Sequence, residues 1–157
     1  MGKVLGRDEL KTALSSARSE GKTVVFTNGC FDLIHVGHIR YLKEAKGLGD
    51  VLVVAVNSDK SVSVIKPGRP VIPGVHRAEV VSALEMVDYV TLFNEDTPYE
   101  LIKFLRPDVL VKGGDWRKED IAGHDLVPVT LSLPYIEGAS TTEIIEKIKG
   151  VKTAVLM

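Results

Sequence analysis

Two histidines, His35 and His38, lie on either side of Gly37, directly after an apolar run and at the start of a helical pattern. At this spacing both imidazoles can lie beside the first turn of the helix, whose backbone N–H groups have no partners within the helix. Displacement at the α-phosphate of a nucleoside triphosphate builds charge on the nonbridging oxygens, and imidazole donors at the positive end of a helix dipole stabilise such charge. We therefore expect His35 and His38 to catalyse nucleotidyl transfer, while Gly37 keeps the approach clear. The alternatives are a structural pair, with one histidine capping the helix, and a zinc site, for which no nearby cysteine or acidic residue is a compelling partner.

A second anion site is expected at the start of the last helical pattern. Ser140, Thr141 and Thr142 open this pattern after Gly138, and Glu143 is close enough in sequence to complete a capping arrangement. One interpretation is ordinary helix capping. The functional interpretation is that the hydroxyls and free N–H groups hold the β- and γ-phosphates of the triphosphate.

Basic and glycine-rich segments follow other apolar runs. Lys66, Arg69 and Arg77 lie in or just after a loop punctuated by proline and glycine, which can close over the site and bring charge to the incoming phosphate and the leaving pyrophosphate. In residues 112–116, glycines allow a flat base to approach the backbone, with a tight turn as the alternative. Cys30 is expected to be a small loop residue, because no general base is paired with it that would make it a nucleophile.

The elements that position these residues alternate between strand and helix. Strands are predicted at residues 23–27, 50–57, 89–93, 109–112 and 127–133, and Asn28-Gly29 is expected to break the first of them. Helices are predicted at residues 8–20, from His35 to Gly47, and at residues 58–65, 75–86, 98–105 and 140–149. This order predicts an α/β fold with a doubly wound parallel sheet of the Rossmann-like type, in which ligands bind beyond the carboxyl ends of the strands. The segments at that edge are residues 28–38, 58–77, 112–116 and 134–142.

Length and composition limit the class of protein. The 157 residues are 45% apolar and 26% charged, which fits a single domain over residues 1–157. The net charge of −1 provides no bulk attraction to nucleic acid or to an anionic membrane. A single cysteine and the absence of a long apolar run lead us to expect a cytoplasmic protein with no membrane span.

Residues 27–38 read Thr-Asn-Gly-Cys-Phe-Asp-Leu-Ile-His-Val-Gly-His and resemble the signature of the cytidylyltransferase-like nucleotidyltransferases, whose hallmark is H-x-G-H. Further motifs at residues 56–59, 69–71, 83–88, 95–98, 110–116 and 140–145 resemble the adenylyltransferase domain of bifunctional heptose-phosphate enzymes. The resemblance extends over roughly residues 8–149, nearly the whole chain.

The resemblance implies transfer of AMP from ATP to D-glycero-β-D-manno-heptose 1-phosphate, giving ADP-heptose for a lipopolysaccharide core or another surface glycan. It also implies a Mg²⁺ ion bound mainly through the triphosphate and not by the protein, a homodimer, and a kinase activity supplied by another chain. The residues that it assigns to catalysis are His35, His38 and Lys66. Those that it assigns to the nucleotide are Asn28, Gly29, Cys30, Phe31, Gly37, Arg77, Lys112, Gly113, Gly114, Asp115, Ser140, Thr141 and Thr142. Asp32, Asn57, Asp59 and Arg69 are assigned to the acceptor substrate.

The alternatives with the same chemistry are a glycerol-3-phosphate cytidylyltransferase, which uses CTP, and an FAD synthetase of the archaeal type. Glycerol-3-phosphate cytidylyltransferases carry an arginine where Tyr135 stands and an acid where Gly114 stands, so these two positions favour the adenylyl reaction. A nonenzymatic nucleotide sensor is the alternative of a different class, and it has no need for two imidazoles at the α-phosphate.

Overall fold

The computed structural model describes residues 1–134 and 139–151, so Tyr135 and Gly138 lie outside the described residues. The described strands are β1 (Lys3–Val4), β2 (Val24–Gly29), β3 (Val51–Asn57), β4 (Tyr89–Phe93), β5 (Val109–Gly113) and β6 (Val129–Leu133). The α-helices are α1 (Arg7–Ser19), α2 (Val36–Lys46), α3 (Asp59–Ile65), α4 (Gly74–Ser82), α5 (Tyr99–Leu105) and α6 (Thr141–Gly150). Two short 3₁₀ helices, η1 (Lys118–Asp120) and η2 (His124–Leu126), precede β6.

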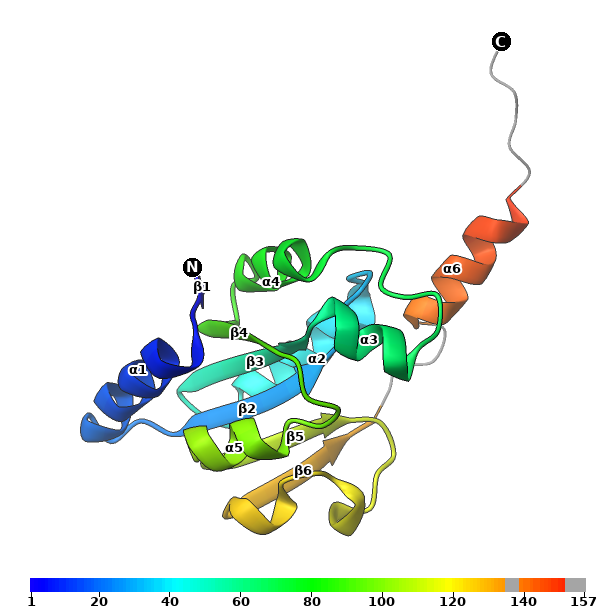
Figure 1. The fold of residues 1–157 in the computed structure, drawn as a ribbon. Helices are drawn as coiled ribbons and strands as arrows, with labels where there is room; N and C mark the ends of the chain where they lie inside the picture. The colour runs from blue at the N-terminus through cyan, green and yellow to red at the C-terminus, as the bar shows by residue number, and fades with distance from the viewer. Residues whose placement is uncertain (135–138, 152–157) are drawn as a thin grey trace.

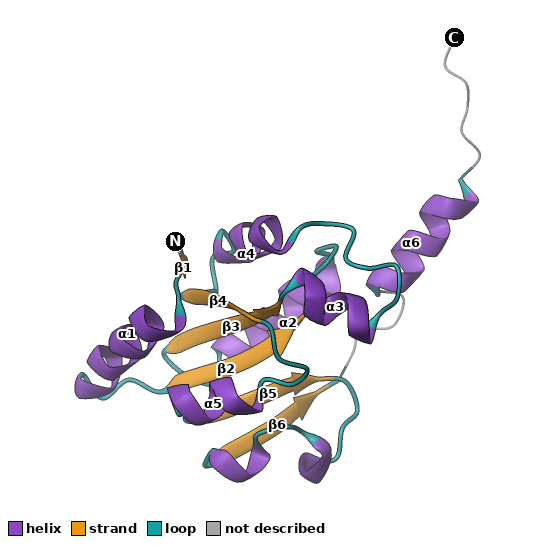
Figure 2. Cartoon of the chain, viewed as in Figure 1, coloured by secondary structure: helices purple, strands orange, loops and turns teal. Residues whose placement is uncertain are grey.

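The described strands form one sheet in the order β1-β4-β3-β2-β5-β6, and each neighbouring pair is parallel. Figure 2 shows this sheet with helices on both of its faces. Alternate residues of β2 point to opposite faces, so that Phe26 packs in a cluster with α1 and α5, whereas Val25 packs in a second cluster with α2 and α4. The predicted doubly wound α/β fold is confirmed.

The position of the site follows from the strand order. The chain runs outward from β2 to β3 and β4, and later adds β5 and β6 on the other side of β2. The order therefore reverses between β2 and β5, and ligands of open parallel sheets bind in the crevice at such a point. The His35 loop follows β2 directly, and residues 112–116 lie at the end of β5 and just after it.

Three boundaries differ from those predicted. Asn28 and Gly29 continue β2 instead of breaking it, because both pair in register with β3. Helix α4 ends at Ser82 and not at Met86, since the Ser82 carbonyl accepts a hydrogen bond from the backbone N–H of Gly2 (3.0 Å). The last strand begins at Val129, because Val127 is the C-cap of η2 and Pro128 has no backbone N–H to donate to the sheet. Strand β1, which pairs with β4, was not predicted because two residues are too few to show a pattern.

Helix α6 has a different relation to the sheet from the other helices. Figure 1 shows it extending away from the body of the molecule, with its first turn beside the loop that follows α3. A hydrogen bond from the Arg69 guanidinium to the Thr142 hydroxyl (3.1 Å) joins these two segments. The start of α6 therefore belongs to the edge of the sheet where the site is expected.

Candidate active site

A cavity of about 770 Å³ lies at the carboxyl ends of the central strands. This volume falls within the range of small-molecule sites. Sixteen of the predicted residues line it: Asn28, Gly29, Cys30, Phe31, Asp32, His35, Gly37, His38, Asn57, Lys66, Arg69, Lys112, Gly113, Ser140, Thr141 and Thr142. The tertiary structure thus brings segments that are more than 100 residues apart in sequence to one cavity.

The two histidines form a reciprocal cap at the start of α2. The Nδ1 atom of His35 accepts a hydrogen bond from the backbone N–H of Gly37 (3.1 Å), and Nδ1 of His38 accepts one from the backbone N–H of His35 (3.2 Å). The ring centroids are only 3.9 Å apart. A neutral imidazole whose Nδ1 is an acceptor carries its proton on Nε2. Capping therefore fixes a tautomer in which each ring has an Nε2–H donor left for a ligand.

The protonation of both rings favours this arrangement. Burial, together with smaller contributions from the nearby His35 and Lys66, lowers the pKa of His38 to about 4. Burial also lowers the pKa of His35, against a smaller opposing effect of Glu143. Both imidazoles are consequently neutral at pH 7 and act as hydrogen-bond donors without carrying a full charge.

Close packing around the histidines explains the small residues of the motif. A Cβ atom on Gly37 would lie 2.9 Å from the His35 ring and 3.2 Å from Cβ of Ala139. A Cβ atom on Gly29 would lie 2.9 Å from the ring of Phe31. Phe31 has a left-handed backbone (φ 49°) that turns its buried ring toward His38, with 5.2 Å between the centroids. The Phe31 ring therefore packs against one side of the His38 ring and supports its position.

Two lysines give the cavity positive charge. Lys66 and Lys112 both line it, and in the described part of the chain neither forms an ion pair. Burial lowers the pKa of Lys112; Lys66 lowers it further, while Cys30 has the opposite effect. Two neighbouring cations without carboxylate partners, beside two Nε2–H donors, make the cavity suitable for a polyanion.

The second helix N-terminus contributes to the same cavity. Ser140 is the N-cap of α6, and its hydroxyl accepts a hydrogen bond from the backbone N–H of Glu143 (3.1 Å). The Thr141 hydroxyl donates to the carbonyl of Leu33 (3.3 Å), which ties α6 to the loop after β2. The capping interpretation is thus correct for Ser140, and it leaves the first N–H groups of α6 beside the cavity for a ligand.

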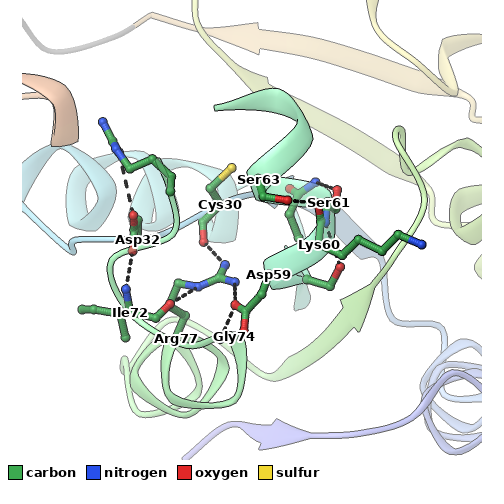
Figure 3. A network of polar contacts seen from close by, with 12 residues as sticks. Cys30, Asp32, Asp59, Lys60, Ser61, Ser63, Ile72, Gly74 and Arg77 are labelled. Atoms are coloured by element: carbon green, nitrogen blue, oxygen red, sulfur yellow. Dashed lines mark hydrogen bonds and ion pairs between the residues drawn. The ribbon is translucent and has the colours of Figure 1, made fainter. Parts of the chain in front are cut away.

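Arg77 and Asp59 do not line the cavity, so its lining does not support the predicted phosphate contact of Arg77 or the predicted substrate contact of Asp59, and both stay predictions. The Arg77 side chain is 0% exposed, and it donates to the carbonyls of Cys30 (2.6 Å) and Ile72 (2.8 Å) and to the Asp59 carboxylate (2.8 Å). Figure 3 shows the guanidinium at the centre of these contacts, below α3. These three bonds hold the buried guanidinium to the protein, so a phosphate contact would have to compete with them.

Asp32 and Arg69 line the cavity but are also engaged with the protein. The Asp32 carboxylate accepts hydrogen bonds from the backbone N–H groups of Val71 (2.9 and 3.0 Å) and Ile72 (2.9 Å). The Arg69 guanidinium lies 3.8 Å from the same carboxylate. Contact with an acceptor substrate, as predicted for Asp32, would have to compete with these bonds.

The predicted nucleotide segment at the end of β5 is only partly at the cavity. Lys112 and Gly113 line it, but Gly114 is buried with φ 117° and donates its N–H to the Leu133 carbonyl (2.8 Å), while Asp115 is exposed. The cavity lining therefore does not include Gly114 and Asp115, and their predicted contact with the nucleotide stays a prediction. The Trp116 indole does line the cavity and lies 5.5 Å from the Lys112 ammonium.

Two of the groups of lining residues that sequence reasoning missed could have been found from sequence signals. Tyr41 lies one turn after His38 on α2, so helical spacing from the motif would have found it. Its hydroxyl bonds to the Thr27 hydroxyl (2.5 Å) and to the Val111 carbonyl (3.2 Å), which fixes α2 against the sheet. Residues 96–98 also line the cavity, and they follow β4, so the rule that ligands bind beyond strand ends would have indicated them.

The described residues contain no group of three histidine, cysteine or acidic side chains that could hold a metal ion. None of the described helices has the length and apolar character needed to cross a bilayer.

Comparison with known proteins identifies the family. The model of the cytidylyltransferase-like family matches residues 26–147. The chain belongs to this family. The match begins within β2, contains both histidines and extends into α6, so it includes every segment that lines the cavity, and the predicted membership is confirmed.

Individual relatives are similar over nearly the whole chain. The bifunctional protein HldE of Syntrophotalea carbinolica is 52% identical over 152 residues, and that of Nitratiruptor sp. is 48% identical over 144 residues. These alignments cover 93% and 91% of this chain but only 31% of each relative, so the chain spans about a third of their length. A crystal structure described as the lipopolysaccharide core biosynthesis protein of Thermoplasma volcanium is 29% identical, with a TM-score of 0.65, and covers 74% of this chain and 100% of that one.

Proposed function

We propose that this chain is a nucleotidyltransferase that transfers AMP from ATP to D-glycero-β-D-manno-heptose 1-phosphate, giving ADP-heptose and pyrophosphate. The observation that carries the proposal is the pair of neutral, capped histidines whose Nε2–H donors lie in one cavity with two lysines that form no ion pair among the described residues. Family membership and relatives named bifunctional protein HldE support the choice of reaction. The resemblance to the adenylyltransferase domain of bifunctional heptose-phosphate enzymes supports the choice of substrates.

In the proposed reaction an oxygen of the sugar 1-phosphate attacks the α-phosphorus of ATP. A new P–O bond forms as the bond from the α-phosphorus to the bridging oxygen breaks, and pyrophosphate leaves with the electron pair of that bond. His35 and His38 donate their Nε2–H groups to the nonbridging oxygens, where charge increases in the transition state. Lys66 and Lys112 balance the charge of the phosphates, and the N–H groups at the start of α6 hold the polyphosphate tail.

We expect Mg²⁺ to enter with the triphosphate, where it offsets part of the charge on the leaving pyrophosphate. The residues around the cavity fit an ion held by the substrate better than one held by the protein. Asp32, a buried carboxylate, is already bonded to backbone N–H groups, and the described residues offer no cluster of three metal ligands. Because the reaction uses ATP, we place the enzyme in the cytoplasm, and we expect a homodimer.

A pyrophosphate-release screen tests the proposal. Purified protein with Mg²⁺ is mixed with ATP or CTP and with heptose 1-phosphate, glycerol 3-phosphate or FMN. Pyrophosphate release with ATP and heptose 1-phosphate, and with no other combination, would support the proposal. Release only with CTP and glycerol 3-phosphate, or only with FMN, would replace the proposed substrates, and binding of ATP with no release for any acceptor would point to a nucleotide sensor.

A further inference from the structure

The loop at residues 66–73 joins α3 to α4 and carries Lys66 and Arg69 to the edge of the cavity. Lys66, Pro67, Gly68, Val71 and Pro73 are exposed, and only Arg69, Pro70 and Ile72 are half-buried. So little apolar surface is covered that hydrophobic packing cannot set the position of this loop. Its polar contacts must do so instead.

Two separate contacts hold the far end of the loop. Asp32, which is 4% exposed, accepts the N–H groups of Val71 and Ile72 from the cavity side. Arg77 donates to the carbonyl of Ile72 from below. Figure 3 shows Ile72 between these two side chains, so both faces of one peptide segment are held.

Both contacts connect the loop to the segment that follows β2. Asp32 belongs to that segment, and Arg77 also donates to the carbonyl of Cys30. On its other side Arg77 pairs with Asp59, which accepts the N–H of Gly74 (2.7 Å) through the same oxygen. These contacts therefore fix the position of the loop relative to the H-x-G-H segment and to the first residues of α3 and α4.

The near end of the loop places charge at the histidines. Lys66 is close enough to His38 and to Lys112 to lower the pKa of both. Movement of the loop would therefore move a cation relative to the α-phosphate site. Arg69 is carried on the same loop and reaches Thr142 at the start of α6.

We propose that Asp32, Asp59 and Arg77 are positioning residues, which act through the loop at residues 66–73 to keep Lys66 at the phosphate site. Their role is distinct from the substrate and phosphate contacts expected from sequence. The catalytic consequence rests on the proposed nucleotidyl transfer, but the placement of Lys66 is a property of the substrate-free protein.

The test uses Asp32→Asn and Asp59→Asn, which keep an oxygen acceptor but remove the charge, while Arg77 itself is left intact to protect the fold. Lys46→Met is the matched control, because it removes the ion pair with Asp88 (2.5 Å) and does not touch the loop. The titration of His38 is followed by NMR in protein without substrate. Release of Lys66 from its position would raise the pKa of His38 above its value in the unmodified protein in both aspartate variants and leave it unchanged in the control.

Lys66→Met distinguishes positioning from general loosening of the structure. It should raise the pKa of His38 by itself, and adding Asp32→Asn or Asp59→Asn to it should cause no further rise, because the cation is already gone. An unchanged His38 titration in both aspartate variants would overturn the proposal, as would a full additional rise in the Lys66→Met background.

Kinetics provide the second measurement. We expect the KM for ATP to rise roughly tenfold in the aspartate variants, because displacement of Lys66 removes one charge-assisted contact with the triphosphate. The change in kcat should be smaller. If the unmodified protein releases no pyrophosphate with any acceptor, the proposed function fails, but the His38 titration still decides whether these residues position Lys66.

Discussion

Replacing His38 separates its structural role from its proposed catalytic one. His38→Ala removes the acceptor for the His35 N–H as well as the Nε2–H donor in the cavity. Loss of a helix cap costs about 1 kcal/mol of folding free energy. Loss of one donor to transition-state charge costs about 3 kcal/mol, which corresponds to a decrease in kcat of roughly 10² to 10³.

His38→Glu is the matched variant. A glutamate at this position of a helix can accept the hydrogen bond from the N-cap N–H, as in an ordinary capping box, so the structural contact is retained. It cannot donate to a phosphate and adds a negative charge. We therefore expect His38→Glu to be more stable than His38→Ala but no more active.

Two assays measure these effects. Thermal or urea unfolding reports the stability of each variant, and single-turnover pyrophosphate release at saturating ATP reports the chemical step. The reasoning is refuted if His38→Ala turns over at nearly the rate of the unmodified protein. It is also refuted if activity in the two variants follows their stability, because the histidine would then act only as a cap.

Three further predictions follow from the same geometry. Because the pKa of His38 is lowered in the folded protein, the unfolded chain binds more protons than the folded one between about pH 6.5 and about pH 4. The free energy of unfolding should therefore fall as the pH falls through this window. Urea unfolding across that range should show a smaller fall for His38→Ala than for the unmodified protein. Lys112→Met should weaken ATP binding roughly tenfold or more, since a half-buried cation that forms no ion pair among the described residues is lost from the polyanion site. Calorimetric titration with ATP checks this, and unchanged affinity would show that Lys112 does not contact the nucleotide. Ser140→Ala should lower stability by about 1 kcal/mol through loss of the α6 cap, and a rise in KM for ATP in steady-state kinetics would show in addition that the start of α6 holds the phosphates.

The sequence by itself determined the fold class and the core of the site. Apolar runs alternating with helical patterns predicted a doubly wound parallel α/β sheet, because burial of both faces imposes these patterns locally, whereas the order of the strands came from the tertiary structure. The H-x-G-H motif could be placed between a strand and a helix N-terminus for the same reason, and from that position a phosphate site followed. Its two histidines and most of the other predicted residues share one cavity in the structure.

Only the tertiary structure decided what several polar residues do. Arg77 and Asp59 have the residue types of ligand-binding groups, but the partners of Arg77 include residues 18 and 47 positions away in sequence, and these contacts hold both side chains outside the cavity lining. The end of α4 depended likewise on a bond from Gly2, and the place of Trp116 beside Lys112 depended on how β5 and β6 pair. Local patterns record which face of an element is buried, whereas the partner of a hydrogen-bonding side chain depends on contacts between distant segments. The structure added the proton positions as well, because the two capping bonds within residues 35–38 show which nitrogen of each ring accepts and therefore which one carries the proton.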